Sequence, residues 1–444
     1  MRIQLSEHFT YRKLLRFVLP SIAMMIFTSI YSVVDGLFVS NFVGKTPFAA
    51  INLIMPVLFI LGSIGLMAGA GGSAILGKTL GENEGEKAKK YFSTMVYALA
   101  AAGLIFGLIG FAVMQPLSIA LQAEGEMLAD CVLYGRVLMF ALPFQMLQMA
   151  FQSFFITAEK PKLGLMVTLI AGVTNMVLDA LLIVVFQWGL FGAAIATAIS
   201  QIFGALLAIL YFARKNDSLL QLTLKTKLYW KVLLNVCTNG SSEMVSNLAA
   251  SLINMLYNFQ LMRFAGENGV AAYGVIMYVS FVFSAIFYGY TMGSAPIISY
   301  QYGAQNHTEL KNMFKKSTHI MLAAGIIMVV SVITTAGPLT KVFVGYDQDL
   351  YDMTVHAFQV FAVTFLLSGF SIFGSGFFTA LNNGKISAAI AFLRTFVFEV
   401  FAILMMPIIF GLDGIWWAVV VAESAAFLVT GIFLLIKRKT YHYA

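Results

Sequence analysis

Apolar residues fall into twelve long segments along the chain, and the charged residues gather in the gaps between them. Each segment is long enough to cross about 30 Å of hydrocarbon as a helix, which rises about 1.5 Å per residue. Helices are predicted rather than strands, because a lone strand cannot satisfy its backbone in lipid and barrel strands would be short and alternating. The segments lie at about 14–42, 47–77, 91–115, 131–158, 163–187, 189–213, 229–264, 269–300, 317–336, 354–381, 386–410 and 413–436.

The pattern repeats at a spacing of 222 residues, which is half of the 444-residue chain. Positions that match without a gap include Phe42 with Phe264, Gly44 with Gly266, Gly81 with Gly303, Pro116 with Pro338 and Gly189 with Gly411. So many matches at one offset indicate a duplicated membrane unit. Six helices per unit is an even number, so both copies enter the membrane from the same side and are related by a pseudo-twofold axis along the membrane normal.

We therefore predict an all-α integral membrane protein, with twelve transmembrane helices in two six-helix lobes. The first lobe covers residues 1–213 and the second covers residues 229–444, and a polar cytoplasmic connector at 214–228 joins them. The composition agrees, because a chain with 60% hydrophobic and 11% charged residues and a mean hydropathy of +0.87 has no polar coat for water.

Positive charge predicts the orientation. With both termini cytoplasmic, 22 of the 27 Lys and Arg residues, Arg2 among them, fall in cytoplasmic segments. Lys45, Arg263 and Lys341 fall in outer loops, and Arg136 and Arg394 lie within helices. This asymmetry follows the positive-inside rule and places a multi-pass protein in the plasma (inner) membrane. Anionic lipid at the inner leaflet accounts for the net charge of +7, so nucleic acid is not an expected partner.

The sequence lacks the residue patterns that several kinds of enzyme chemistry require. The sequence has no phosphate-cradling Gly-Lys-Ser/Thr loop, so ATP hydrolysis is not expected. Cys131 and Cys237 have no metal-ligand spacing, and the five histidines are scattered without a zinc-type pairing. We find no nucleophile or metal set for an enzyme and expect no cofactor. A duplicated membrane unit is typical of a transporter, and without ATP hydrolysis the energy for transport would come from an ion gradient.

Five carboxylates fall within the predicted helices, and each costs several kcal/mol in hydrocarbon unless it faces a cavity, a partner or an ion. They are Asp35, Asp179, Glu243, Glu399 and Glu423. Asp35 lies about 10 Å below the outer surface, and Asp179 and Thr197 lie about 12 Å below it. Asn175 is one turn from Asp179 on the same helix face. This set supplies hard oxygen ligands for Na⁺ or a coupled proton; a satisfied structural network is the alternative.

The second lobe does not repeat this set. Asp35, Asn175, Asp179 and Thr197 correspond to Tyr257, Val397, Phe401 and Val419. A residue that is polar in one copy and apolar in its twin is not required by the symmetry of the fold. This asymmetry favours an ion-coupling role for the first-lobe residues.

The second lobe carries other charges. Glu399 and Glu423 lie near mid-membrane, about 15 Å deep, where they suit either recognition of a cationic drug or a buried pair that shares a proton. Glu243 and Arg394 lie nearer the cytoplasm, and we expect them to form a structural pair or inner gate. Tyr257 and Tyr278 offer ring faces to cations, and Met255 is a polarizable, flexible neighbour. We assign Glu399, Glu423, Tyr257, Tyr278 and Met255 to the substrate cleft.

The chain resembles the multidrug and toxic compound extrusion (MATE) family along nearly its whole length. The resemblance rests on Pro20, on Asp35 fifteen residues later, on the stretch from Gly44 to Pro56 and on the Gly81 loop, with their echo in the second lobe. It implies two helical bundles around a central cleft and export of small amphipathic, cationic organic molecules in exchange for H⁺ or Na⁺.

One branch of that family has an Asp on the first helix, a Tyr on the fourth, Asn and Asp four residues apart on the fifth, and a Thr eighteen residues later. The matching residues here are Asp35, Tyr134, Asn175, Asp179 and Thr197. The resemblance also implies that the first helix bends at Pro20. We expect a monomeric exporter that works by alternating access. The alternatives are a flippase for a lipid-linked oligosaccharide from the same superfamily and, from another class, a channel or receptor.

Overall fold

The computed structural model describes residues 3–444, except for the side chain of Ser32, and this part of the chain is built from helices joined by short turns. Arg2, counted above among the cytoplasmic charges, lies outside the described residues. The first-lobe elements are α1 (Tyr11–Phe42), α2 (Lys45–Gly81), α3 (Gly85–Ala120), α4 (Gly125–Thr157), α5 (Pro161–Asp179), the π-helical segment η1 (Ala180–Val185) and α6 (Gly189–Ala213). The second-lobe elements are α7 (Trp230–Gly303), α8 (His307–Val344), α9 (Gln348–Ala362), α10 (Thr364–Ala380), α11 (Gly384–Phe392), the π-helical segment η2 (Leu393–Glu399) and α12 (Val400–Tyr441).

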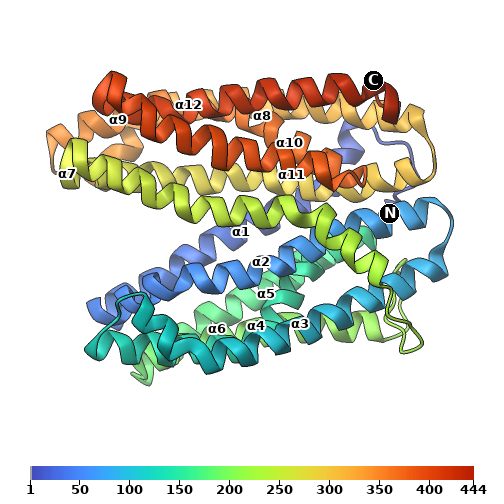
Figure 1. Cartoon of the computed structure of the whole chain (residues 1–444), viewed down its shortest axis with the longest axis horizontal. Helices are drawn as coiled ribbons and strands as arrows, with labels where there is room; N and C mark the ends of the chain where they lie inside the picture. The colour runs from blue at the N-terminus through green and yellow to red at the C-terminus, as the bar shows by residue number, and fades with distance from the viewer. Residues whose placement is uncertain (1–2) are drawn as a thin grey trace.

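Within the described residues, nine helices are long and apolar enough to cross a membrane, and the bent pair of α9 and α10 makes a tenth candidate. Two of the nine are far too long for one crossing. The 74 residues of α7 would extend about 110 Å as a straight helix, against about 30 Å of hydrocarbon. Figure 1 shows α7 doubling back on itself as two arms. The same holds for the 58-residue stretch Gly384–Tyr441, so counting each as two spans gives the predicted twelve.

The breaks in these long helices follow the sequence repeat. Gly266 interrupts α7 with φ 60° and ψ −147°, and Gly411 interrupts α12 with φ 60° and ψ −137°. Their counterparts 222 residues earlier, Gly44 and Gly189, also have positive φ, at 124° and 56°. Glycine adopts these angles without the steric penalty of a Cβ atom. The duplicated unit therefore reverses direction at the same two places in each copy.

The lobes lie against each other at the end of the molecule that carries both chain termini, here called the termini end, and they diverge toward the opposite, far end (Figure 1). At the termini end, a Cβ atom on Gly81 would lie 2.1 Å from the carbonyl oxygen of Tyr300, and one on Gly303 would lie 2.1 Å from that of Lys78. Gly81 and Gly303 are 222 residues apart, and so are Lys78 and Tyr300. The contact is thus self-complementary, as a twofold axis between the lobes requires.

Each lobe supplies most of one apolar core, and α1 contributes residues to both cores. Before Pro20, the residues Leu14, Phe17 and Val18 are buried in the core of the second lobe, whereas Val39 near the other end of α1 belongs to the core of the first lobe. Around Pro20, α1 packs on the second arm of α7, where Gly289 and Gly293 allow close approach. Met24 also belongs to the second-lobe core, so α1 crosses from one lobe to the other between Met24 and Val39, beyond Pro20.

The segment before α1 contacts both lobes at the termini end. Leu5 and Phe9 are fully buried. The N–H of Phe9 donates to Oε1 of Glu309 on α8 at 2.9 Å, and its carbonyl accepts a hydrogen bond from Asn312 at 3.0 Å. The N–H of Leu5 donates to Oε1 of Glu159, in the turn between α4 and α5, at 2.7 Å. This segment therefore holds the two lobes together where they meet.

Candidate functional site

The five residues predicted for ion coupling lie on four helices of the first lobe. Asp35 is half-buried on α1, Tyr134 is buried on α4, Asn175 and Asp179 are buried on α5, and Thr197 lies on α6. Asp179 is completely inaccessible to solvent, which is rare for a carboxylate without a charged partner. The five residues therefore come from helices that converge in the first lobe.

The structure brings these side chains together. Nδ2 of Asn175 lies 3.5 Å from Oγ1 of Thr197, at the limit of a hydrogen bond. The carboxylates of Asp35 and Asp179 interact with each other across the contact between α1 and α5. The hydroxyl of Tyr134 lies beside both carboxylates and beside Thr197. The result is one cluster of oxygen and amide groups rather than separate polar positions.

The carboxylate oxygens of this cluster have spare bonding capacity. Among the described residues, neither oxygen of Asp179 has a hydrogen-bond partner, and neither has Oδ1 of Asp35. No cation of the protein forms an ion pair with either carboxylate in the described part of the chain. Two adjacent carboxylates in an apolar setting are stable only when a proton or a cation neutralises them. The geometry is therefore suited to taking up H⁺ or Na⁺.

A π-helical segment begins directly after Asp179. In η1 the helix widens, and at its end the N–H of Phe186 donates to the carbonyl of Leu181, five residues earlier, at 2.8 Å. Such widened turns occur often at functional sites. The second π-helical segment, η2, contains Arg394 and ends at Glu399. Sequence reasoning did not predict either segment, because an apolar run such as Ala180–Val185 suits an α-turn equally well.

The second lobe corrects one predicted pairing. Arg394 was expected to pair with Glu243, but its Nε and Nη2 donate instead to Oε1 of Glu423, at 2.9 and 2.7 Å. The reason is that η2 packs mainly along α12, which carries Glu423, and only slightly against α7, which carries Glu243. The side chain of Glu423 is 7% exposed and that of Arg394 is 16% exposed, so the ion pair is buried.

The five residues assigned to the substrate cleft differ in their surroundings. Tyr257 is buried and its ring stacks on Tyr273 at 4.8 Å between centroids, with Glu399 close to both rings. Glu423 is held by Arg394. Tyr278 stacks on Phe343 of α8, with centroids 6.2 Å apart, and Met255 is 72% exposed. Of this set, Glu399, Glu423 and Tyr257 lie near one another, whereas Tyr278 and Met255 are more exposed.

Metal ligands of the usual kind are not gathered anywhere in the described residues, where no group of three or more His, Cys, Asp or Glu side chains converges. The first-lobe cluster has two carboxylates, and its remaining ligands would be an amide and hydroxyl groups. Such a set fits a monovalent cation or a proton better than a tightly bound transition metal.

Similar proteins agree with this architecture. Two Staphylococcus relatives are both called multidrug export protein MepA. The one from Staphylococcus aureus (strain MSSA476) is 26% identical over 417 residues, covering 93% of this chain and 91% of the relative. The one from Staphylococcus saprophyticus is 24% identical over 414 residues with the same coverage.

Solved structures match the fold along the full chain. A crystal structure of MATE in complex with MaL6 superposes with a TM-score of 0.93 at 20% identity, covering 99% of this chain and 98% of that one. An outward-facing conformation of a multidrug resistance MATE family transporter of the MOP superfamily has a TM-score of 0.90 at 20% identity, covering 98% and 97%. The MatE family model matches twice, over residues 20–181 and 244–405, once in each copy of the repeat. The chain therefore belongs to the MatE family, as its sequence pattern predicts, and it has the all-helical, membrane-spanning fold of MATE transporters.

Proposed function

We propose that the protein is a secondary active exporter that expels small amphipathic, cationic organic molecules from the cell in exchange for H⁺ or Na⁺. The observation that carries this proposal is the cluster of Asp35 and Asp179 with Asn175, Thr197 and Tyr134, buried in only one of two duplicated lobes. Full-length similarity to proteins called multidrug export protein supports organic molecules as the substrates.

The exporter would lie in the plasma membrane as a monomer, with both termini cytoplasmic. The positive-inside pattern of the sequence supports this orientation, and Figure 1 draws both termini at one end of the molecule. With the termini inside, the lobes meet on the cytoplasmic side and diverge outward. The domain boundaries at 213 and 229 are part of the same proposal.

In the proposed cycle, an ion arriving from outside neutralises Asp35 and Asp179. Loss of their mutual repulsion changes the packing of α1 against α5, because each helix carries one of the two carboxylates. The bend would fall at Pro20, since proline interrupts the hydrogen bonding of a helix and lies between the part of α1 before it, which packs in the second lobe, and Asp35. Ion binding is thereby coupled to the relative position of the lobes.

For substrate recognition, we propose Glu399 as the principal acidic contact in the second lobe. Glu423 is already neutralised by Arg394, so the carboxylate of Glu399 provides the remaining negative charge of that pair of glutamates. Tyr257 and Tyr273 add ring faces next to it. Tyr278 and Met255 would contribute only peripheral apolar contact.

The test is efflux of a cationic dye such as ethidium from proteoliposomes, driven separately by an imposed Na⁺ gradient and an imposed pH gradient. One of the gradients should drive efflux, and Asp35→Asn and Asp179→Asn should each abolish it. Asp413→Asn is a matched control, because Asp413 is a surface carboxylate whose partner is His356. Dye efflux that depends on neither gradient, or that continues in both variants, would contradict the proposal and favour the flippase alternative.

A further inference from the structure

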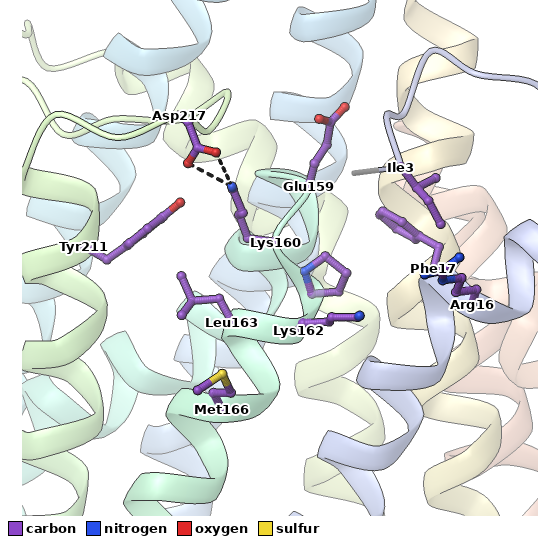
Figure 2. A pocket seen from close by; sticks show the side chains of 11 residues that line it. Ile3, Arg16, Phe17, Glu159, Lys160, Lys162, Leu163, Met166, Tyr211 and Asp217 are labelled. Carbon is purple, nitrogen blue, oxygen red and sulfur yellow. Dashed lines mark hydrogen bonds and ion pairs between the residues drawn. The ribbon is translucent and has the colours of Figure 1, made fainter. Parts of the chain in front are cut away.

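A cavity of about 440 Å³ opens at the termini end, between the start of α1 and the α4–α5 turn. Its size is within the range of about 300–1,000 Å³ that small-molecule sites usually occupy. Figure 2 shows the residues around it: Arg16 and Phe17 come from α1, and Lys160, Lys162, Leu163 and Met166 come from the α4–α5 turn and α5. None of these residues belongs to the ion-coupling cluster.

Positive charge prevails around the cavity. Arg16, Lys160 and Lys162 line it, against the acids Glu159 and Asp217. Lys160 is already paired, since its Nζ lies 2.7 and 2.8 Å from the two carboxylate oxygens of Asp217 (Figure 2).

The other charged groups are placed differently. Glu159 is mostly buried and accepts the N–H of Leu5 at 2.7 Å, so it is directed toward the N-terminal segment. Arg16 and Lys162 are exposed, and neither forms an ion pair with a described residue. Two cationic groups therefore face the cavity with their charge available.

The backbone of α5 adds to this charge. The helix begins at Pro161, beside the cavity, and runs for 19 residues. The N-terminus of a helix carries a partial positive charge and favours an anion. The cavity thus combines a helix N-terminus with two unpaired cations, which is a suitable setting for a phosphate group.

Apolar side chains form the other wall. Phe17, Leu163 and Met166 line the cavity, and Met166 is 56% exposed on the first turns of α5, where that helix enters the membrane. Apolar side chains would not stabilise a free phosphate ion, whereas the glycerol backbone and first acyl carbons of a lipid would pack against them. The cavity lies at the ends of membrane-spanning helices, at the level where phospholipid headgroups are found.

We propose that this cavity binds the headgroup of an anionic phospholipid, with the phosphate between Arg16 and Lys162 and the acyl chains descending past Leu163 and Met166. Because Phe17 and the rest of the start of α1 pack with the second lobe and α5 belongs to the first, the lipid would contact both lobes at the place where they meet.

The experiment is lipid titration of the full-length purified protein, with the first bound lipid quantified by native mass spectrometry. Short-chain phosphatidylglycerol is compared with phosphatidylcholine of the same chain length, and inorganic phosphate is added as a competitor. Wild-type protein should bind phosphatidylglycerol more tightly than phosphatidylcholine. Each cation near a membrane surface contributes about fivefold in affinity, so Arg16→Gln with Lys162→Gln should weaken phosphatidylglycerol binding by roughly 10- to 30-fold.

Two controls make the result specific. Arg438→Gln with Lys439→Gln removes the same two charges from the exposed end of α12, outside the cavity, and should change binding less than twofold. Arg16→Lys with Lys162→Arg keeps both charges and should retain binding, which separates loss of charge from loss of fold. Equal binding of the two lipids, unchanged binding in the double glutamine variant, or displacement of the lipid by millimolar phosphate would each overturn the proposal.

Discussion

The buried pair of Arg394 and Glu423, which replaces the predicted pair of Arg394 and Glu243, leads to a prediction about stability. Both nitrogens of Arg394 that bond Glu423 reach the same oxygen, Oε1, and the second oxygen of Glu423 has no partner among the described residues. Replacing Arg394 with glutamine leaves the buried carboxylate of Glu423 without its cation. Replacing Glu423 removes the hydrogen-bonded partner of Arg394 and leaves Glu399 as the nearby carboxylate. Removing one partner of a buried ion pair typically costs about 3–5 kcal/mol, whereas removing both is often close to neutral.

These energies convert to a measurable change in melting temperature. The unfolding entropy is about 2.1 cal/mol/K per residue. A loss of 3–5 kcal/mol therefore lowers the melting temperature by roughly 3–5 °C if the whole chain unfolds as one unit, and by roughly 6–10 °C if one lobe does. We expect such a fall for Arg394→Gln and for Glu423→Gln, measured by thermal unfolding in detergent. The double variant should lose clearly less than the sum of the two single losses.

The matched control is the exposed pair of Lys87 and Glu84, whose nitrogen and oxygen are 2.6 Å apart. Surface pairs contribute about 0–1 kcal/mol, so glutamine at either position should change the melting temperature by about 2 °C or less. Additive losses in the Arg394 and Glu423 variants, or single variants as stable as the wild type, would refute the buried pairing.

Three further predictions follow from the packing, the orientation and the proposed substrate contact. Gly81→Ala should weaken the closed contact between the lobes and impair transport, since its Cβ would lie 2.1 Å from the carbonyl of Tyr300; Gly85→Ala nearby meets no atom within 4 Å and should be tolerated. In whole cells of a Cys237→Ser background, cysteines at Glu126 and Asp349 should react with an impermeant reagent, and cysteines at Lys89 and Asp217 should not; the reverse pattern would contradict the orientation. Glu399→Gln should reduce efflux of a cationic substrate more than that of a neutral one, and equal loss of both would show that Glu399 is not a substrate contact.

Much of the fold was predictable because a membrane restricts the chain to few solutions. Apolar segment length sets the number of crossings, and the repeat predicts that Gly266 and Gly411 interrupt their helices as Gly44 and Gly189 do. The first-lobe cluster was predictable for a related reason. Helices have a fixed rise per residue, so equal distances from helix ends place side chains at equal depth.

Other features depend on rotations that a sequence pattern does not carry. Arg394 pairs with the residue on whichever helix its side of η2 faces, and that helix is α12. A π-helical turn rotates the residues that follow it, and no residue type in the sequence identifies such a turn. The docking of Phe9 on Glu309 was also missed, because the short polar segment before α1 has no periodicity that indicates a contact 300 residues away.

The central claim is that the cluster of Asp35 and Asp179 holds the ion that is exchanged for substrate, so substrate binding should release that ion. It is tested most directly by adding ethidium to purified protein in weakly buffered detergent solution and counting the protons or Na⁺ ions released. We expect about one ion per protein for the wild type and for the Asp413→Asn control, and none for Asp35→Asn or Asp179→Asn. Ethidium binding without release of either ion, or the same release from Asp179→Asn as from the wild type, would contradict the account.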